Sequence, residues 1–204
     1  AFWYNCLYHV PLPPNHRFPM QKYRSVRLAL QAELAQDDAL FTPSPLATHD
    51  ELRTVHTHEY VASYVEGRLT VAQNRRVGFP WSQASVDRSL SSTGGTVAAA
   101  RAVCEKGVVF AGHLAGGTHH SFADRGEGFC VFNDIAVAAR VALRDYSSTV
   151  SSVLIVDLDV HQGNGCAHIF KDDPSVFTFS MQCASNYFSA RQESDLDVDV
   201  PAGT

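Results

Sequence analysis

Apolar residues recur every three or four positions along much of the chain, which is the period of an amphipathic helix. In the first such segment the stripe consists of Val26, Leu28, Leu30 and Leu34. The predicted helices cover residues 22–34, 49–69 with an interruption near residues 56–58, 85–107, and 133–146. Gly107 would end the third helix despite the weak centre at Gly94-Gly95, and Asn133 or Asp134 would cap the fourth. The prolines of the first 20 residues predict an extended lead-in.

Three apolar runs of strand length occur in the second half of the chain. The predicted strands cover residues 108–112, 151–160 and 175–181. The second run is so apolar that we expect both of its faces to be buried. Strand, helix and strand in succession predict an α/β fold, with a mainly parallel sheet, right-handed crossovers and flanking helices.

Composition and charge narrow the class of protein. A chain of 204 residues with 45% hydrophobic residues is long enough for one sizeable core, and we expect a single domain. The net charge is −5 and no basic block exceeds Arg75-Arg76, which argues against a nucleic-acid-binding surface. No apolar run reaches the length of a membrane span, so we expect no membrane partner.

The cysteines and the first residue bear on the compartment. Five cysteines without a C-x-x-C pair favour a reducing, intracellular location, and leave cytoplasm, nucleus and organelle open. Because the chain begins without Met, we expect it to be processed or excerpted, so that a targeting segment could have been removed.

Residues with metal-binding chemistry follow the second predicted strand. In LIVDLDVHQGNG, residues 154–165, the alternation of a strand would place Asp157, Asp159 and His161 on one face. Carboxylate and imidazole ligands suit zinc, and a mixed set with room for water suits a catalytic site. The alternative is that the aspartates only cap the next turn while His161 packs as a neutral side chain.

A pair of adjacent histidines, His119 and His120, lies in a Gly-rich loop after the first predicted strand. Adjacent imidazoles disfavour each other's protonation, so one can remain a neutral base near pH 7 while a carboxylate keeps the other charged. Loop histidines are more often solvated or capping. In one βαβ unit with an Asp-x-Asp-x-His strand, however, the pair indicates a metal site with an adjacent base.

Two segments resemble the signature motifs of the zinc-dependent histone deacetylase and acetylpolyamine amidohydrolase family. They are GGTHHSFADRGEGFCVFND, residues 116–134, and VLIVDLDVHQGNG, residues 153–165. The segments HRFPMQKYR, VHTHEYV and GFPWS resemble the class IV and bacterial-type branch, so the resemblance covers nearly the whole chain. It implies a three-layer arginase/deacetylase-like α/β fold that is incomplete at its C-terminus, with residues 1–204 forming a single, partial catalytic domain.

The resemblance also implies roles for individual residues. His119 and His120 would be the paired catalytic histidines, with Asp157 as the partner of the first and Asn164 as the partner of the second. An amide partner should make His120 less basic than a carboxylate would. The implied zinc ligands are Asp159 and His161.

The acyl tunnel and the potassium sites of the family map onto further positions. Gly128 would offer its carbonyl to the substrate amide and Phe129 would line the tunnel, whereas the loop at Tyr187 and Phe188 departs from the family's form. One potassium site would use backbone oxygens of Asp157, Asp159 and His161 together with Ser180 and Met181, and another the carbonyls of Phe170, Asp173 and Val176.

The implied activity is zinc-dependent removal of acetyl or other acyl groups from lysine side chains of histones or other proteins. His120 would remove the proton of the water, although the sequence leaves open which histidine does which task. Three alternatives remain: a deacetylase of small acetylated amines such as polyamines, an arginase-like two-manganese hydrolase, and a non-catalytic module that binds acyl-lysine. The two-manganese enzyme would need a carboxylate in place of Asn164.

The motifs supply only two of the three protein ligands that a catalytic zinc usually takes. In the family a later aspartate and a later tyrosine complete the site, and we expect them beyond Thr204 rather than among Asp195, Asp197 and Asp199. We therefore expect the 204-residue chain by itself to be inactive and poorly stable. The sequence leaves the substrate and the oligomeric state open.

Overall fold

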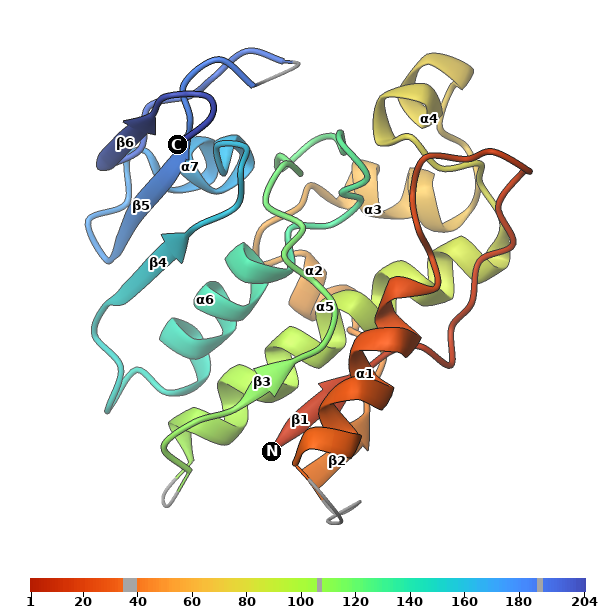
Figure 1. Cartoon of the computed structure of the whole chain (residues 1–204). Coiled ribbons are helices and arrows are strands. Elements are labelled where there is room, and N and C mark those ends of the chain that lie inside the picture. Colours follow the sequence, from red (N-terminus) through yellow and green to blue (C-terminus); the bar gives the residue numbers. More distant parts are fainter. Residues whose placement is uncertain (35–39, 106–107, 187–188) are drawn as a thin grey trace.

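The computed structural model describes residues 1–34, 40–105, 108–186 and 189–204, and within them every pairing between strands is parallel. The strands form two three-stranded sheets with helices packed around them (Figure 1). One sheet has the order β2-β1-β3, and the other has the order β4-β5-β6. The strands are β1 (Phe2–Tyr4), β2 (Phe41–Pro43), β3 (Gly112–His113), β4 (Val153–Asp157), β5 (Val176–Cys183) and β6 (Leu196–Val200). The predicted α/β class with parallel strands is confirmed.

The helices agree with the predicted segments and add two short ones. They are α1 (Lys22–Glu33), α2 (His49–Leu52), α3 (His58–Val65), α4 (Val71–Val77), α5 (Gln83–Cys104), α6 (Asp134–Asp145) and α7 (Asn164–Phe170). The predicted interruption near residues 56–58 separates α2 from α3, because Thr57 starts a new helix by accepting a hydrogen bond from the Tyr60 N–H. Helices α4 and α7 were missed, since seven residues are too few to show a helical period. None of the described helices is long and apolar enough to cross a membrane.

Two buried clusters hold the loop that carries the histidine pair. One cluster includes Leu52, Tyr60, Tyr64 and Phe132, and the other lies under β4 and includes Ile155, Phe170 and Val176. The Tyr60 hydroxyl donates to the Val131 carbonyl at 2.8 Å, which fixes the end of the loop to the first cluster. The loop therefore runs between two separate parts of the core.

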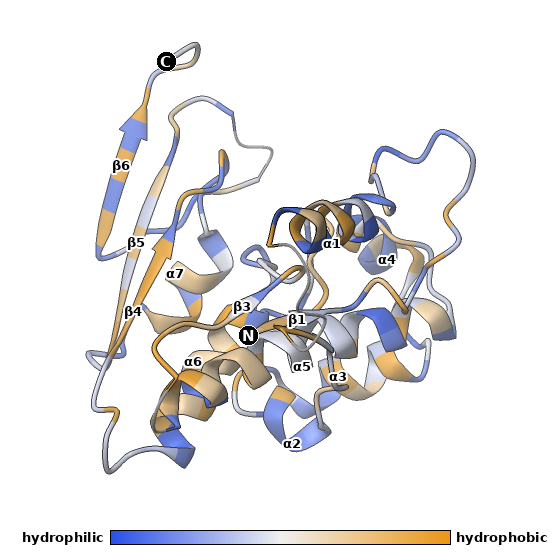
Figure 2. Ribbon diagram, turned by 60° about the horizontal axis from the view of Figure 1, so that its bottom comes forward, coloured by the Kyte–Doolittle hydropathy of each residue, from blue (hydrophilic) through white to orange (hydrophobic). Residues whose placement is uncertain are grey.

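Strand β4 differs from its prediction because only one of its faces is covered. Ile155 and Asp157 are buried, whereas Leu154 and Val156 are 62% and 54% exposed. Helices α6 and α7 lie on the covered side, and β4 is the edge of its sheet within the described residues (Figure 2). An apolar run alone does not report how many faces of a strand are covered.

One further expectation about an element is wrong. Val109 and Phe110 are 95% and 65% exposed and form no strand, because β1 pairs only with Gly112 and His113 in this region. The helix predicted on residues 22–34 is confirmed as α1, which contains no buried residue. Gly107, the expected C-cap of α5, lies outside the described residues, and β1 was missed within the Pro-rich lead-in.

The glycine in the middle of α5 allows another segment to approach the helix. A Cβ atom at Gly94 would lie 2.1 Å from the Pro45 carbonyl oxygen and 2.7 Å from the Ala47 nitrogen. The Ala47 N–H in turn donates to the Leu90 carbonyl of α5 at 3.0 Å. The loss of helix propensity at Gly94 is therefore the cost of this close packing.

Replacing Gly94 by Ala should destabilise the protein although alanine favours helices. We expect a loss of about 2 kcal/mol in the free energy of unfolding, because the backbone of residues 45–47 must move away from α5. Urea unfolding measures the change, and Gln83→Ala at an exposed position of the same helix should stay within about 0.5 kcal/mol of the wild type. An unchanged or increased stability of Gly94→Ala would contradict the packing argument.

Candidate active site

The start of α6 positions the loop that carries the histidine pair. The buried carboxylate of Asp134 accepts hydrogen bonds from the backbone N–H groups of Thr118 at 2.7 Å and Gly117 at 3.1 Å. The side chain of Asn133, the N-cap of α6, donates to the Ser121 carbonyl at 2.9 Å. The residues predicted as helix caps thus also hold the backbone on both sides of His119-His120.

The N-terminus of α7 joins the two sequence motifs. The N–H groups of Gly165 and Cys166 donate to the carbonyl oxygen of His119 at 2.9 Å and 3.3 Å. A Cβ atom at Gly165 would lie 2.4 Å from the Ser121 carbonyl oxygen and 2.5 Å from that of His119, so this position requires glycine. The backbone contact explains why the second motif contains a glycine after Asn164.

His119 forms a buried ion pair with Asp157. Its Nδ1 lies 2.5 Å from Asp157 Oδ2, and both side chains are less than a tenth exposed. Burial lowers the pKa of His119, but the hydrogen bond and the charge of Asp157 outweigh it and raise this pKa above its ordinary value. Burial raises the pKa of Asp157, and the hydrogen bond and charge of His119 bring it below its ordinary value. Both shifts favour the charged forms.

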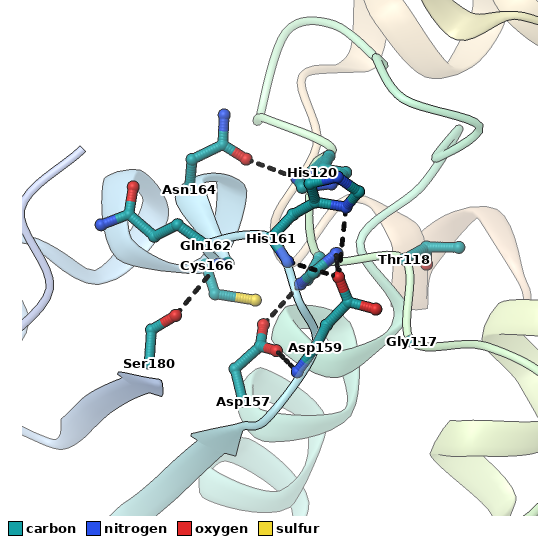
Figure 3. A network of polar contacts seen from close by, with 12 residues as sticks. Gly117, Thr118, His120, Asp157, Asp159, His161, Gln162, Asn164, Cys166 and Ser180 are labelled. Atoms are coloured by element: carbon teal, nitrogen blue, oxygen red, sulfur yellow. Dashed lines mark hydrogen bonds and ion pairs between the residues drawn. The ribbon is translucent and has the colours of Figure 1, made fainter. Parts of the chain in front are cut away.

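His120 has a neutral partner instead. Its Nδ1 lies 2.8 Å from Asn164 Oδ1, and its ring centroid is 4.0 Å from that of His119. The contact with Asn164 is the dashed line between these two side chains in Figure 3. Burial and then the positive charge of His119 lower the pKa of His120 to about 4. At neutral pH the two imidazoles therefore differ, with His119 favoured as the cation and His120 as the neutral base.

Asp159 and His161 lie beside the pair, but strand alternation does not bring them there. Strand β4 ends at Asp157, and the following N–H groups fold onto the carboxylates: that of Asp159 donates to Asp157 at 3.0 Å and that of His161 donates to Asp159 at 2.8 Å. Nδ1 of His161 lies 3.3 Å from Asp159 Oδ1, and Nε2 of His119 lies 3.8 Å from the same oxygen. Figure 3 shows Asp159 and His161 side by side after the end of β4. The two aspartates thus have the turn-capping contacts of the alternative interpretation, and the binding of a metal by Asp159 and His161 stays a prediction.

The donor set fits two ligands of a catalytic zinc. A carboxylate and an imidazole are suitable donors, and they border an open cleft that leaves room for water and substrate. Within the described part of the chain, no group of three His, Cys, Asp or Glu side chains is placed to hold a metal ion. A third ligand would have to come from elsewhere.

The acidic residues near residue 200 have other partners. Asp195 accepts hydrogen bonds from the backbone N–H and the hydroxyl of Thr178, and Asp197 accepts one from the side-chain amide of Gln162 at 2.7 Å. Asp199 forms an ion pair with Arg191 at 2.7 Å. These three carboxylates therefore have partners within the chain, and the expectation that they are not zinc ligands stays a prediction.

A cleft of about 710 Å³ opens above the histidine pair, and the predicted substrate-binding residues Gly128 and Phe129 line it. The Phe129 ring lies 5.2 Å from the ring of Phe18 and 5.3 Å from that of Phe79. Phe18 was not predicted, although an aromatic residue within a Pro-rich lead-in was a usable signal. Tyr187 and Phe188, where the loop departs from the family's form, lie outside the described residues.

The residues predicted for potassium remain a prediction. Ser180 pairs with Asp157 across β4 and β5, and Met181 follows it. Phe170 ends α7, Val176 begins β5, and Asp173 lies in the turn between them, where the carbonyl of Phe170 accepts the Asp173 N–H and that of Asp173 accepts the Val176 N–H. This arrangement gives the turn a fixed shape but does not identify an ion.

The fold and the site together define a class of protein. A parallel α/β scaffold presents a charged and a neutral imidazole beside an Asp/His donor pair, which is the arrangement that metal-assisted hydrolases use for acid–base chemistry. Residues 16–193 match the histone deacetylase domain. The chain therefore belongs to the histone deacetylase family, and the resemblance of its two motifs is confirmed.

Individual relatives agree with this family. The chain is 45% identical over 197 residues to an uncharacterized protein of Picosynechococcus sp., covering 96% of the chain and 64% of that protein. It is 32% identical over 181 residues to the acetoin utilization protein AcuC of Bacillus subtilis, covering 85% of the chain and 46% of AcuC. A crystal structure of a histone deacetylase (HDAC) homolog from Aquifex aeolicus superposes with a TM-score of 0.76 at 25% identity, covering 98% of the chain and 58% of the homolog. The chain thus spans between 46% and 64% of the length of these proteins.

The ion pair of His119 and Asp157 predicts a definite pH dependence. Its stabilisation is complete between the ordinary pKa values of 3.8 for Asp and 6.5 for His. It is lost as the pH rises through the raised pKa of His119, and also as the pH falls through the lowered pKa of Asp157.

In Asp157→Asn the pKa of His119 should fall below 6.5, because burial persists while the negative charge is gone. NMR titration of the histidine rings measures this pKa. Asp124→Asn, which removes an exposed carboxylate outside the site, should leave it unchanged. A His119 pKa that stays raised in Asp157→Asn would show that another group charges the ring.

Proposed function

We propose that the complete protein is a zinc-dependent amidohydrolase that removes acetyl or other acyl groups from lysine side chains. The observation that carries the proposal is the difference between the two buried imidazoles. Asp157 raises the pKa of His119, whereas burial and the charge of His119 lower the pKa of His120, and both rings lie beside the donors Asp159 and His161. Hydrolysis of an amide needs such a division, since a base must accept a proton from water and an acid must give one to the leaving amine.

Asp159 and His161 would hold the zinc, together with a third ligand that we propose lies in a segment beyond residues 1–204. When bound, zinc would polarise the acyl carbonyl and lower the pKa of a water molecule. His120 accepts a proton from the attacking water at Nε2, because its Nδ1 faces the Asn164 oxygen. His119 stabilises the developing negative charge and donates a proton to the amine as the C–N bond breaks.

The walls of the cleft fit an acylated lysine. The rings of Phe129 and Phe18 would pack against the methylene groups of the lysine stem, and the Gly128 carbonyl would accept the amide N–H of the substrate. We further propose an intracellular enzyme, which the five free cysteines support.

The surroundings of Asn164 disfavour the arginase-like alternative. Asn164 is completely buried, its amide oxygen faces His120, and its amide nitrogen donates to Glu127 at 2.9 Å. Both ends of the amide are thus engaged within the protein. A second metal ion would have to displace His120 or Glu127 from this residue.

Replacing His120 by Ala in the complete protein should abolish turnover without removing zinc. We expect kcat to fall by about 1,000-fold, the usual contribution of a general base, with the zinc content unchanged because Asp159 and His161 remain. Kinetics on an acetyl-lysine peptide and metal analysis measure the two effects. His58→Ala, an exposed position on α3, serves as the control.

Two other outcomes would reject parts of the proposal. Full turnover in His120→Ala would remove this residue from the role of base. A wild-type protein that binds zinc and acetyl-lysine peptides without turnover would instead be the non-catalytic module.

The mouth of the cleft carries positive charge, which bears on the substrate. Four basic residues line it: Arg17, Lys22, Arg75 and Arg76. Among the described lining residues the acidic one is Asp159, a proposed zinc ligand. Acetylated polyamines carry further ammonium groups that this mouth would repel. We therefore propose acyl-lysine in a neutral or acidic protein segment as the substrate.

Peptides with the same acetyl-lysine but different neighbours test this preference. The complete protein should show a kcat/KM about tenfold higher for acidic than for basic flanking residues, and the difference should shrink as salt is added. Arg75→Glu combined with Arg76→Glu should reduce it, whereas Arg53→Glu, outside the lining of the cleft, should not. Equal or better turnover of acetylpolyamines would favour the small-amine alternative.

A further inference from the structure

A buried acidic residue lies behind the neutral histidine of the pair. Glu127 is 6% exposed, and its Oε1 accepts a hydrogen bond from Asn164 Nδ2 at 2.9 Å. Asn164 Oδ1 in turn lies 2.8 Å from Nδ1 of His120. The three side chains form a line from the interior to the cleft, and the sequence motifs assigned no task to the first of them.

The side-chain amide of Asn164, which lies between Glu127 and His120, has two possible orientations. A side-chain amide has an acceptor at one end and donors at the other, and rotation by 180° exchanges them. A carboxylate only accepts, so Glu127 takes the NH₂ group of Asn164 and directs the amide oxygen toward His120. An oxygen in that place requires a proton on Nδ1 of His120, which puts the lone pair on Nε2.

The opposite orientation would disable the base. An NH₂ group facing His120 would pair with a lone pair on Nδ1, and the proton of the neutral ring would then be on Nε2. In that tautomer Nε2 donates and cannot accept a proton from water. The direction of one buried amide thus decides whether His120 is able to act.

The backbone around Glu127 keeps the carboxylate in place. The carbonyl of Glu127 accepts the Cys130 N–H at 2.9 Å, and the next two N–H groups donate to the end of α4, from Gly128 to Arg76 and from Phe129 to Val77. This tight turn is anchored on both sides. Glu127 therefore has a defined position that does not depend on the substrate.

We propose that Glu127 is the positioning residue of His120: by fixing the amide orientation of Asn164, it selects the tautomer in which Nε2 accepts a proton. The inference rests on the proposed function for its catalytic consequence. It does not require Glu127 to touch the substrate, the metal or the reacting atoms.

The test exchanges the chemistry of the two buried partners in the complete, zinc-loaded protein. Glu127→Gln can either accept or donate, so it removes the preference for one orientation of Asn164. We expect kcat to fall by about tenfold with KM within about twofold of the wild type. Asn164→Asp brings a second carboxylate against Glu127, and we expect a larger loss.

The double variant distinguishes positioning from a mere structural role. In Asn164→Asp the new carboxylate accepts directly from the His120 ring and needs a donor behind it. The change Glu127→Gln supplies that donor, because a glutamine side chain carries an NH₂ group. The same Glu127→Gln change should therefore lower kcat next to Asn164 and raise it about tenfold in the Asn164→Asp background. A loss of similar size in both backgrounds would overturn the proposal.

A spectroscopic measurement gives a readout that does not depend on activity. The ¹⁵N signals of the His120 ring should show the Nδ1–H tautomer in the wild type and a mixture of both tautomers in Glu127→Gln. An unchanged tautomer in Glu127→Gln would overturn the proposal. If the wild type shows no turnover, the proposed function fails, while the tautomer measurement still decides on Glu127. Glu59→Gln, an exposed position on α3, is the matched control, and thermal unfolding verifies that each variant is folded.

Discussion

The hydrogen bonds from the N-terminus of α7 to the His119 carbonyl are the contact on which the site depends. They join the loop before α6, which carries the histidine pair, to the turn after β4, which carries Asp159 and His161. Only a glycine at position 165 lets the two backbones come this close. The histidine pair and the Asp159–His161 donors are therefore held together by main-chain contacts, and the side chains can be committed to charge and proton transfer.

The two imidazoles differ because their partners differ by a single functional group. Asp157 meets His119 with a full negative charge, whereas Asn164 meets His120 with a neutral amide and leaves the carboxylate of Glu127 one residue further away. Burial acts on both rings in the same direction, so the partner decides which ring favours the proton. Neighbouring groups of the same type acquire different tasks in this way.

The sequence predicted which residues meet at the site better than it predicted their surroundings. The residues of each motif, the His119-His120 pair and the Asp-x-Asp-x-His run, are contiguous or nearly contiguous and are flanked by glycines. Both motifs can therefore be identified without knowledge of the fold. We predicted from strand alternation that Asp159 and His161 lie near Asp157. They do lie near it, but β4 ends at Asp157 and a turn, not a continued strand, brings them there.

Other features could not be predicted because they depend on distant contacts. Glu127 looks like a solvated loop acid until Asn164, 37 positions away, is placed against it. Phe18 reaches the cleft from a segment without any hydrophobic period, and the exposed face of β4 depends on which elements cover it. Local patterns report helices, caps and reactive residues, whereas burial is a property of the assembled fold.

The backbone at Gly128 and Phe129 links the aromatic wall of the cleft to Glu127. Gly128 and Phe129 have φ angles of 59° and 66°, so a left-handed turn separates the aromatic wall from Glu127 by only one residue. The N–H groups of both residues also donate to the end of α4, from Gly128 to Arg76 and from Phe129 to Val77. One short stretch of backbone thus fixes both the aromatic wall of the cleft and the carboxylate behind Asn164, so a substitution that displaces this turn would disturb the two together.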